Sequence, residues 1–216
     1  MSKTRRIVII GGHGNGMVLA QIICDMRRSG ADIELFGFLN DHLNPGELLW
    51  DWPVLGKSTD WQTLPADVEF CFALLTVGKM LERTKLLKSL SIPADRMATL
   101  IHPTAVLGFN TSVGKGSVLC SYTSVQPGVR IGDNTLIRAG ANLGHDVEIG
   151  NYVDIGPNVT LCGYCKIRDG SHIAANTVVR DGLEVGEFCT LGAGAVMLRE
   201  APPYSTWLGN PARRVM

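Results

Sequence analysis

Residues 131–167 read IGDNTLIRAGANLGHDVEIGNYVDIGPNVTLCGYCKI, and every sixth residue of this stretch, counted from the first, is isoleucine or leucine. The same period continues in both directions without an insertion. It places an aliphatic residue at sixteen successive positions: Ile101, Leu107, Val113, Leu119, Val125, Ile131, Ile137, Leu143, Ile149, Ile155, Leu161, Ile167, Ile173, Val179, Val185 and Leu191. A period of six fits neither an α-helix nor a long alternating strand, so it predicts a short strand and a turn, repeated many times.

The other positions of the hexad are patterned as well. Position two is often glycine, which we expect to allow unusual backbone angles in the turn. Position five is small or β-branched in most hexads. Three hexads would form one triangular coil, and coils would stack at the usual strand spacing of about 4.8 Å. The hexads therefore predict a parallel β-helix, with position one pointing into the prism and position five packed beside it.

The first half of the chain alternates strands and helices, which predicts a small parallel sheet. The expected elements are a strand that ends at Ile10, the loop Gly11–Gly16, a helix over Met17–Arg28, strands over Leu35–Leu39 and Phe70–Thr76, and a helix over Lys79–Leu90. Ligands bind at the carboxyl ends of such strands, and glycines there let backbone N–H groups approach a phosphate. Those ends carry the Gly11–Gly16 loop, Asn40-Asp41 and Gly78.

Composition excludes several classes of partner. Acidic and basic residues balance at 20 each, so no net field favours nucleic acid or a membrane surface. No apolar run approaches the roughly 20 residues that a membrane helix needs. The apolar segment Ile7–Ile10 is followed by two glycines, which makes it a strand and not the core of a signal peptide. We therefore expect a cytoplasmic protein with neither a nucleic-acid nor a membrane partner.

The six cysteines are irregularly spaced, and a chain of 216 residues needs no disulfides to fold. Cys162 and Cys165 form a lone C-x-x-C, but no second pair and no histidine partner accompanies it, so we expect no metal. Cys165 and Cys189 fall at position five of their hexads. We expect them to be small, weakly polar residues in tight inward positions.

The hexad pattern [LIV]-G-x-x-[STAV]-x over residues 101–196 resembles that of the hexapeptide-repeat acyltransferases. The whole chain resembles the NeuD/PglD family of sugar O- and N-acetyltransferases. The matching stretches are Ile9-Ile-Gly-Gly-His-Gly-Asn-Gly16, Gly37-Phe-Leu-Asn-Asp41, Val77-Gly-Lys-Met-Leu-Glu-Arg83, Ile101-His-Pro-Thr-Ala105, Gly144-His-Asp146 and Gly209-Asn-Pro-Ala212. The resemblance implies an α/β Rossmann-like domain (1–95), an all-β left-handed parallel β-helix (99–198), a closing loop and tail (199–216), and a homotrimer of parallel prisms.

The resemblance also implies where a nucleotide-linked amino sugar would bind. In the family, the first loop and the segment after the second strand hold the nucleotide-sugar. Here these are Gly12, His13, Gly14, Asn15, Asn40 and Asp41, to which the sheet edge adds Gly78. Asn15 stands where the family has histidine, and His13 stands where it often has serine or glycine.

Acetyl transfer to an amine needs a base, donors for the oxyanion, and binding that holds the amine beside the thioester. His145 is the candidate base, because position three points outward at a turn and because the resemblance implies that the histidine of Gly-His-Asp is catalytic. Asp146 would orient the imidazole. By the same resemblance acetyl-CoA, the co-substrate, would meet position 154 and the Gly163 amide. The residues expected to bind it are Asp154, Gly163, Ala175, Ala193 and Arg213.

Alternatives remain open at this point. His42, His102 and His172 are expected to be structural or solvated. A γ-type carbonic anhydrase also uses a β-helix, but His145 and His172 occupy different hexad positions and do not suit its metal site. Neither the hexads nor His145 distinguish N-acetylation of a nucleotide-linked 4-amino-4,6-dideoxy sugar from O-acetylation of sialic acid or a related sugar. A non-catalytic trimeric scaffold is the third possibility.

Overall fold

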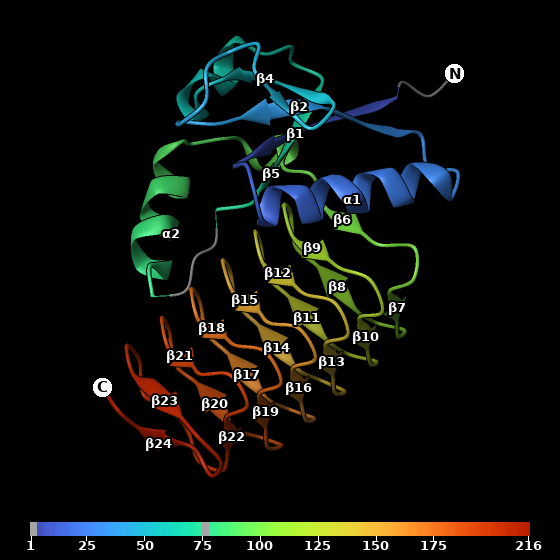
Figure 1. Ribbon diagram of the computed structural model, residues 1–216. Helices are drawn as coiled ribbons and strands as arrows, with labels where there is room; N and C mark the ends of the chain where they lie inside the picture. Colours follow the sequence, from blue (N-terminus) through green and yellow to red (C-terminus); the bar gives the residue numbers. More distant parts are fainter. Residues whose placement is uncertain (1–3, 75–77) are drawn as a thin grey trace.

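The computed structural model describes residues 4–74 and 78–216. Its N-terminal part is a sheet with strand order β3-β4-β2-β1-β5 (Figure 1). The strands are β1 (Arg5–Ile10), β2 (Ile33–Leu39), β3 (Leu48–Leu49), β4 (Trp52–Gly56) and β5 (Val68–Phe72). All pairs are parallel except β3 with β4. The parallel sheet expected from the alternating pattern is therefore present, and Ile10, Leu39 and Phe72 end at the same edge.

Three details of this part differ from the expected elements. The strand predicted over Phe70–Thr76 is β5, which begins earlier, at Val68, and ends at Phe72; Ala73 and Leu74 are not in a strand, and residues 75–77 lie outside the described residues. Strands β3 and β4 were not expected, because they are short and Pro53 breaks the apolar pattern. A 3₁₀ helix, η1 (Ser58–Thr63), follows them, and a second, η2 (Ala94–Arg96), precedes the prism.

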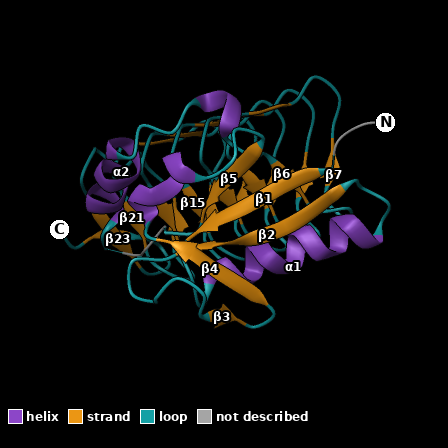
Figure 2. Cartoon of the chain, turned by 90° about the horizontal axis from the view of Figure 1, so that it is seen from above, coloured by secondary structure: helices purple, strands orange, loops and turns teal. Residues whose placement is uncertain are grey.

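Helix α1 (Asn15–Arg28) lies between the sheet and the prism, and helix α2 (Met80–Ser89) lies beside the prism (Figure 1). Helix α1 runs under the sheet and across the first coils (Figure 1), and the view from above shows it along one flank of the sheet (Figure 2). It begins two residues before the expected Met17 and ends, as expected, near Gly30, whose φ is 97°. Its apolar face is buried and includes Leu19, Ile22 and Ile23.

Residues 98–216, all of which the structure describes, form a three-sided parallel β-helix. Successive coils pair residues 18 apart, so three hexads make one coil as predicted. One face carries β7 (Val106–Leu107), β10 (Ser124–Val125), β13 (Asn142–Leu143), β16 (Thr160–Leu161), β19 (Val178–Val179) and β22 (Val196–Met197). A second carries β8 (Ser112–Val113), β11 (Arg130–Ile131), β14 (Glu148–Ile149), β17 (Lys166–Ile167) and β20 (Glu184–Val185).

The third face lies closest to the N-terminal sheet and helices (Figure 1). It carries β6 (Leu100–Ile101), β9 (Val118–Leu119), β12 (Leu136–Ile137), β15 (Asp154–Ile155), β18 (His172–Ile173), β21 (Thr190–Leu191), β23 (Thr206–Leu208) and β24 (Arg213–Arg214). Residues 199–216 are thus more than a loop and tail. β23 continues the sheet in parallel, and β24 folds back antiparallel on β23. The last coil is thereby covered by the chain's own end.

The hexad positions fill the prism as the pattern predicted. Position one is buried from Leu119 to Leu191 and half-buried in the first coil, where the stack begins. Position five is also inward, and Cys165 and Cys189 are buried there without forming disulfides. No helix among the described residues is long and apolar enough to span a membrane.

The expected role of the position-two glycines was wrong. Their φ angles are not positive; instead, the positive φ falls at position four, where residues such as Asn134, Asp146 and Tyr164 stand. A β-carbon at Gly132, in position two, would lie 2.6 Å from the carbonyl carbon of Gly150 in the next coil. Gly132 is therefore needed because the backbones of adjacent coils meet there, and position four tolerates asparagine or aspartate because these enter the left-handed region at little cost.

Candidate functional site

His145 stands on the turn between β13 and β14, at one corner of the prism. Its side chain is half-exposed, as position three predicted. The Nδ1 atom lies 3.0 Å from Oδ2 of Asp146. An ionised carboxylate only accepts hydrogen bonds, so this contact places the ring proton of a neutral imidazole on Nδ1 and leaves Nε2 with a free lone pair. His145 is thus oriented to accept a proton at Nε2.

Gly163 lies next to this nitrogen, one coil further along the prism and at the same hexad position as His145. A β-carbon on Gly163 would come within 2.7 Å of Nε2 of His145. Tyr164 packs edge-on against the imidazole, with the ring centroids 4.8 Å apart, and its backbone N–H donates to the carbonyl of His145 over 3.0 Å. The ring is therefore held from one side, while the absence of a side chain at Gly163 leaves Nε2 accessible.

Asp146 occupies the left-handed position of its turn, with φ of 57°. Gly128 precedes it by one coil, and a β-carbon there would meet Oδ1 of Asp146 at 2.5 Å. Gly128 therefore leaves room for the carboxylate of Asp146, as Gly163 does for the imidazole of His145. A cavity of about 250 Å³ adjoins this corner and is lined by Gly128, Arg130, Asp146, Glu148, Tyr164 and Lys166. Its charged rim suits a polar ligand more than an apolar one.

The Gly11–Gly16 loop follows β1 and enters α1. Gly14 precedes the helix with φ of 76°, and no side chain caps the helix N-terminus. The first turn carries no acidic residue, whereas Arg27 and Arg28 lie in the last turn. The positive end of the helix dipole favours an anion here. His13 and Gly14 are exposed at the tip of the loop, and Gly12 is half-buried.

Asn40 and Asp41 lie where the sequence placed them, beside the glycine-rich loop, but their side chains are already engaged. Asn40 donates through Nδ2 to the carbonyl of Gly11 over 3.1 Å, and its Oδ1 accepts the backbone N–H of His42 over 2.9 Å. Asp41 accepts from the backbone N–H and the hydroxyl of Ser58, over 2.7 and 3.0 Å. Asn40 therefore shapes the glycine-rich loop, whereas Asp41 holds Ser58 at the start of η1.

Asp154 has different partners from those that we expected. Its side chain is only 1 % exposed, and Oδ1 accepts from Nε of Arg138 over 2.8 Å. Oδ2 accepts from Nη2 of Arg138 over 3.0 Å and from Nδ1 of His172 over 3.1 Å. Burial acts to raise the pKa of Asp154, but the hydrogen bonds from His172 and Arg138 outweigh it and the pKa is lowered. The carboxylate is therefore charged and fully engaged within the chain.

Sequence reasoning overlooked Arg138, which joins this buried group to the glycine-rich loop. Its Nη1 donates to Oδ1 of Asn15 over 2.8 Å. The spacing of Arg138 and Asp154 could have indicated this pair. They are 16 residues apart, which in a coil of 18 places Arg138, just after β12, close to Asp154 on the neighbouring strand β15. The structure therefore connects Asn15, Arg138, Asp154 and His172, on the prism face nearest the N-terminal sheet.

The remaining expected residues are spread along the prism. Ala175 and Ala193 lie in turns of later coils, Arg213 is exposed on β24, and Gly78 is exposed with φ of 72° beside residues outside the described set. Within this one chain, no described hydrogen bond joins His145 to the glycine-rich loop or to Asp154. His145 follows β13 on one face, whereas Arg138 and Asp154 lie on the face that contains β12 and β15.

The other histidines behave as predicted. His102 and His172 are buried and hydrogen-bonded, and His42 is exposed. Among the described residues, no group of three or more histidine, cysteine, aspartate or glutamate side chains is arranged to hold a metal ion. Burial raises the pKa of the Cys165 thiol to about 11, which suits a packing role and not a nucleophilic one.

Comparison with known families and sequences adds two findings. A family model described as bacterial transferase hexapeptide (six repeats) matches residues 128–163, which include His145 and Asp154. The UDP-N-acetylbacillosamine N-acetyltransferase of Bacillus subtilis (strain 168) is 30 % identical over 117 residues. That alignment covers 53 % of this chain and 51 % of the relative, so it spans about half the length of each.

Solved structures agree over nearly the whole chain. The acetyltransferase domain of PglB from Neisseria gonorrhoeae FA1090 has a TM-score of 0.84 and 28 % identity, over 98 % of this chain and 100 % of that one. Its complex with acetyl coenzyme A has a TM-score of 0.83. PerB from Caulobacter crescentus, in complex with CoA and GDP-perosamine, shares the fold, with a TM-score of 0.79 and 24 % identity over 97 % of each chain.

Proposed function

Because this chain belongs to the NeuD/PglD family of hexapeptide-repeat sugar acetyltransferases, we propose that it transfers the acetyl group of acetyl-CoA to the amino group of a nucleotide-linked 4-amino-4,6-dideoxy sugar. The observation that carries this proposal is the corner formed by His145, Asp146 and Gly163. There an imidazole is oriented through Nδ1 and left open at Nε2. The Bacillus relative, named as an N-acetyltransferase of a UDP-linked sugar, supports the acceptor class.

In this mechanism Nε2 of His145 removes a proton from the acceptor nitrogen as that nitrogen attacks the thioester carbonyl. The new bond is C–N, and the bond that breaks is C–S. The proton held on the imidazolium then passes to the departing CoA sulfur, which leaves as the free thiol. Asp146 stabilises the imidazolium through its bond to Nδ1. Backbone N–H groups such as that of Gly163 would stabilise the oxyanion, because Asp154 is ionised and cannot donate.

The proposal places the nucleotide at the N-terminal sheet, which we take to be a Rossmann-like domain. Backbone amides of Gly12, His13, Gly14 and Asn15 would meet the phosphates at the N-terminus of α1. Asn40 would act by shaping the adjacent loop, and Asp41, which holds Ser58, is kept as a proposed binding residue because it follows Asn40 at the same strand end. Gly78, at the neighbouring strand end, is kept as a proposed binding residue on the same grounds.

We place acetyl-CoA along a left-handed prism within a homotrimer, in the groove between two prisms. Gly163, Ala175 and Ala193 have small side chains or none, and they would admit the pantetheine arm; Arg213 would contact the phosphates. A lone prism exposes flat sheet faces that association would cover. A groove between chains would also let the His145 of one chain approach the glycine-rich loop of another. We propose that the protein encounters acetyl-CoA and its nucleotide sugar in the cytoplasm.

Thiol release from acetyl-CoA tests the proposal. The purified full chain is assayed with UDP-, GDP- and dTDP-linked 4-amino sugars and with free and CMP-linked sialic acid. Turnover is expected with an amino sugar, and His145→Ala or His145→Asn should lower it by about 10²- to 10⁴-fold. Turnover with sialic acid alone would establish O-acetylation instead. Full activity of His145→Ala would overturn the mechanism, and no turnover with any acceptor would favour a scaffold.

A further inference from the structure

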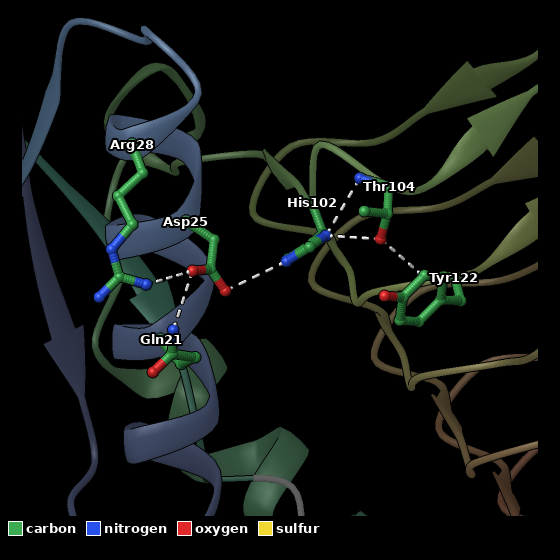
Figure 3. Close-up of polar contacts among 6 residues, drawn as sticks. All are labelled: Gln21, Asp25, Arg28, His102, Thr104 and Tyr122. Carbon is green, nitrogen blue, oxygen red and sulfur yellow. Dashed lines mark hydrogen bonds and ion pairs between the residues drawn. The ribbon is translucent and has the colours of Figure 1, made fainter.

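Helix α1 is joined to the prism by polar side chains near both of its ends. At its N-terminus, Arg138 donates to Asn15 over 2.8 Å. Ten residues later, Nε2 of His102 lies 3.2 Å from Oδ2 of Asp25 (Figure 3). Beside these contacts a cavity of about 450 Å³ lies between helix and prism, lined on the helix side by Met17, Val18 and Ile22 among others. Elsewhere buried apolar residues of both parts, such as Ile23 and Leu100, belong to one core cluster, so the polar contacts add direction to a packed interface.

The contact at the N-terminal end is built to be rigid. Arg138 binds Asp154 through two parallel hydrogen bonds, which fix the plane of the guanidinium and direct Nη1 towards Asn15. The carboxylate of Asp154 is buried and receives a third bond from His172. The orientation of Arg138 is thus set by the prism.

The contact at the other end is also preset by the prism. The backbone N–H of Thr104 donates to Nδ1 of His102 over 3.1 Å, and the Thr104 hydroxyl lies 2.8 Å from the same atom. In this arrangement Nδ1 is the acceptor, so the ring proton is on Nε2, which faces Asp25. Tyr122, in the next coil, fixes the Thr104 hydroxyl through its backbone N–H over 3.0 Å (Figure 3).

Asp25 is held on the helix side in the same way. Its Oδ1 accepts from Nε2 of Gln21 over 2.9 Å and from Nη1 of Arg28 over 2.7 Å (Figure 3). These bonds leave Oδ2 for His102. The segment His102-Pro-Thr104, part of a stretch that resembles the NeuD/PglD family, therefore forms a binding site for one carboxylate of α1.

We propose that Arg138 and His102 are positioning residues that set the place of the glycine-rich loop relative to the prism. The loop is continuous with α1, because Gly14 is the residue that precedes the helix. A helix held at one end could swing, whereas attachments ten residues apart, about 15 Å along the axis, define its direction. This inference rests on the proposed function, in which the loop holds the nucleotide and the prism holds the acetyl donor. Its consequence is control of where the acceptor amine lies.

Hydrogen exchange of the full-length protein tests the anchoring without any substrate. Arg138→Lys keeps a charge for buried Asp154 but lacks the fork that also reaches Asn15. We expect Arg138→Lys and His102→Ala each to raise exchange of the amides in Gly11–Met17 by about tenfold or more. Arg168→Met is the matched control: Arg168 also pairs with an acidic residue 16 positions later, Glu184, but on a prism face away from α1. It should leave loop exchange unchanged.

Steady-state kinetics of the same variants tests the consequence. We expect kcat/KM for the nucleotide sugar to fall by about 10²-fold, because a displacement of about 1 Å can cost that much, while KM for acetyl-CoA stays within twofold. In a protein that is merely destabilised, kcat/KM would fall by the same factor for the nucleotide sugar and for acetyl-CoA. Unchanged loop exchange in Arg138→Lys and His102→Ala overturns the inference. If the unmodified chain acetylates no nucleotide sugar, the proposed function fails, and the exchange result still decides whether the prism positions the loop.

Discussion

The Nε2 atom of His145 occupies the space beside Gly163 that a side chain would need, since a β-carbon on Gly163 would lie 2.7 Å from it. These residues share one hexad position on adjacent coils. The same position on the following coil is Asp181, an exposed residue with a full side chain. The position itself therefore accepts side chains, and glycine is needed at 163 only because the imidazole lies beside it.

Gly163→Ala is expected to lower kcat by about 10²-fold, because the methyl group displaces the imidazole or covers Nε2. The double variant with His145→Ala checks the cause. If the clash with the imidazole is the reason, Gly163→Ala reduces the melting temperature of the unmodified protein and has little effect in the His145→Ala background. Equal losses of stability in both backgrounds would show that the methyl group clashes with the prism instead.

Asp146→Asn should lower kcat by less than His145→Ala does. The amide can still accept a hydrogen bond from Nδ1, but it no longer stabilises the positive charge that forms on the ring. Asp181→Asn, an exposed aspartate in another prism turn, provides the control and should leave kcat unchanged. The measurement is initial rate against pH at saturating substrates. A kcat for Asp146→Asn equal to that of the unmodified enzyme would remove Asp146 from the mechanism.

The prism could be predicted from sequence because the residues that face its single narrow core are aliphatic and recur every six positions. Ile131, Ile137 and Leu143 are apolar for the same local reason, and their burial followed directly. His145 was proposed as the base because position three points outward and because Gly144-His-Asp146 resembles the family's motif. The short strands β3 and β4 gave no such pattern, since Pro53 interrupts it and two residues show no alternation.

The contact of Arg138 with the glycine-rich loop could not be predicted, because it joins the prism to a part of the chain that the hexad pattern does not describe. Arg138 is in position two of its hexad, where glycine is frequent but other residues also occur, and Asp154 is in position six, which varies widely. The hydrogen bond from Arg138 to Asn15 spans 123 residues and depends on how the N-terminal sheet rests on the first coils. A repeat pattern predicts contacts between coils but contains no information about a neighbouring domain.

Asp154→Asn is expected to destabilise the protein by about 3 kcal/mol at neutral pH, because it leaves the largely buried Arg138 without its counter-charge. The pKa of Asp154 in the folded state lies below its ordinary value of 3.8. The unfolded chain therefore takes up the proton first as pH falls. The stabilisation is complete above about pH 5 and disappears as pH drops through 3.8 and then through the folded-state pKa.

Urea unfolding between pH 3 and pH 8, at one fixed protein concentration, measures this difference. The gap between the unmodified protein and Asp154→Asn should be constant above about pH 5 and narrow below it. Glu184→Gln removes an exposed carboxylate from the Arg168 pair and should cost at most about 1 kcal/mol. A gap for Asp154→Asn as small as that for Glu184→Gln would mean that the buried pair adds little to stability.

Gly132→Ala and Gly182→Asn distinguish the two kinds of glycine in the repeat. Gly132, at position two, has no room, since a β-carbon would lie 2.6 Å from the carbonyl carbon of Gly150. Gly182, at position four, has φ of 68° and no atom within 4 Å of the place where a β-carbon would lie. Asparagine already occupies position four with φ near this value at Asn110, Asn134, Asn158 and Asn176.

We therefore expect Gly132→Ala to cost about 2 kcal/mol through overpacking of backbone against backbone, and Gly182→Asn to change the free energy of unfolding by less than about 1 kcal/mol. Neither residue has a role in the proposed chemistry, so kcat of the folded fraction should be unaffected by both. The reverse order of stabilities would mean that position four, and not position two, is where the prism requires glycine.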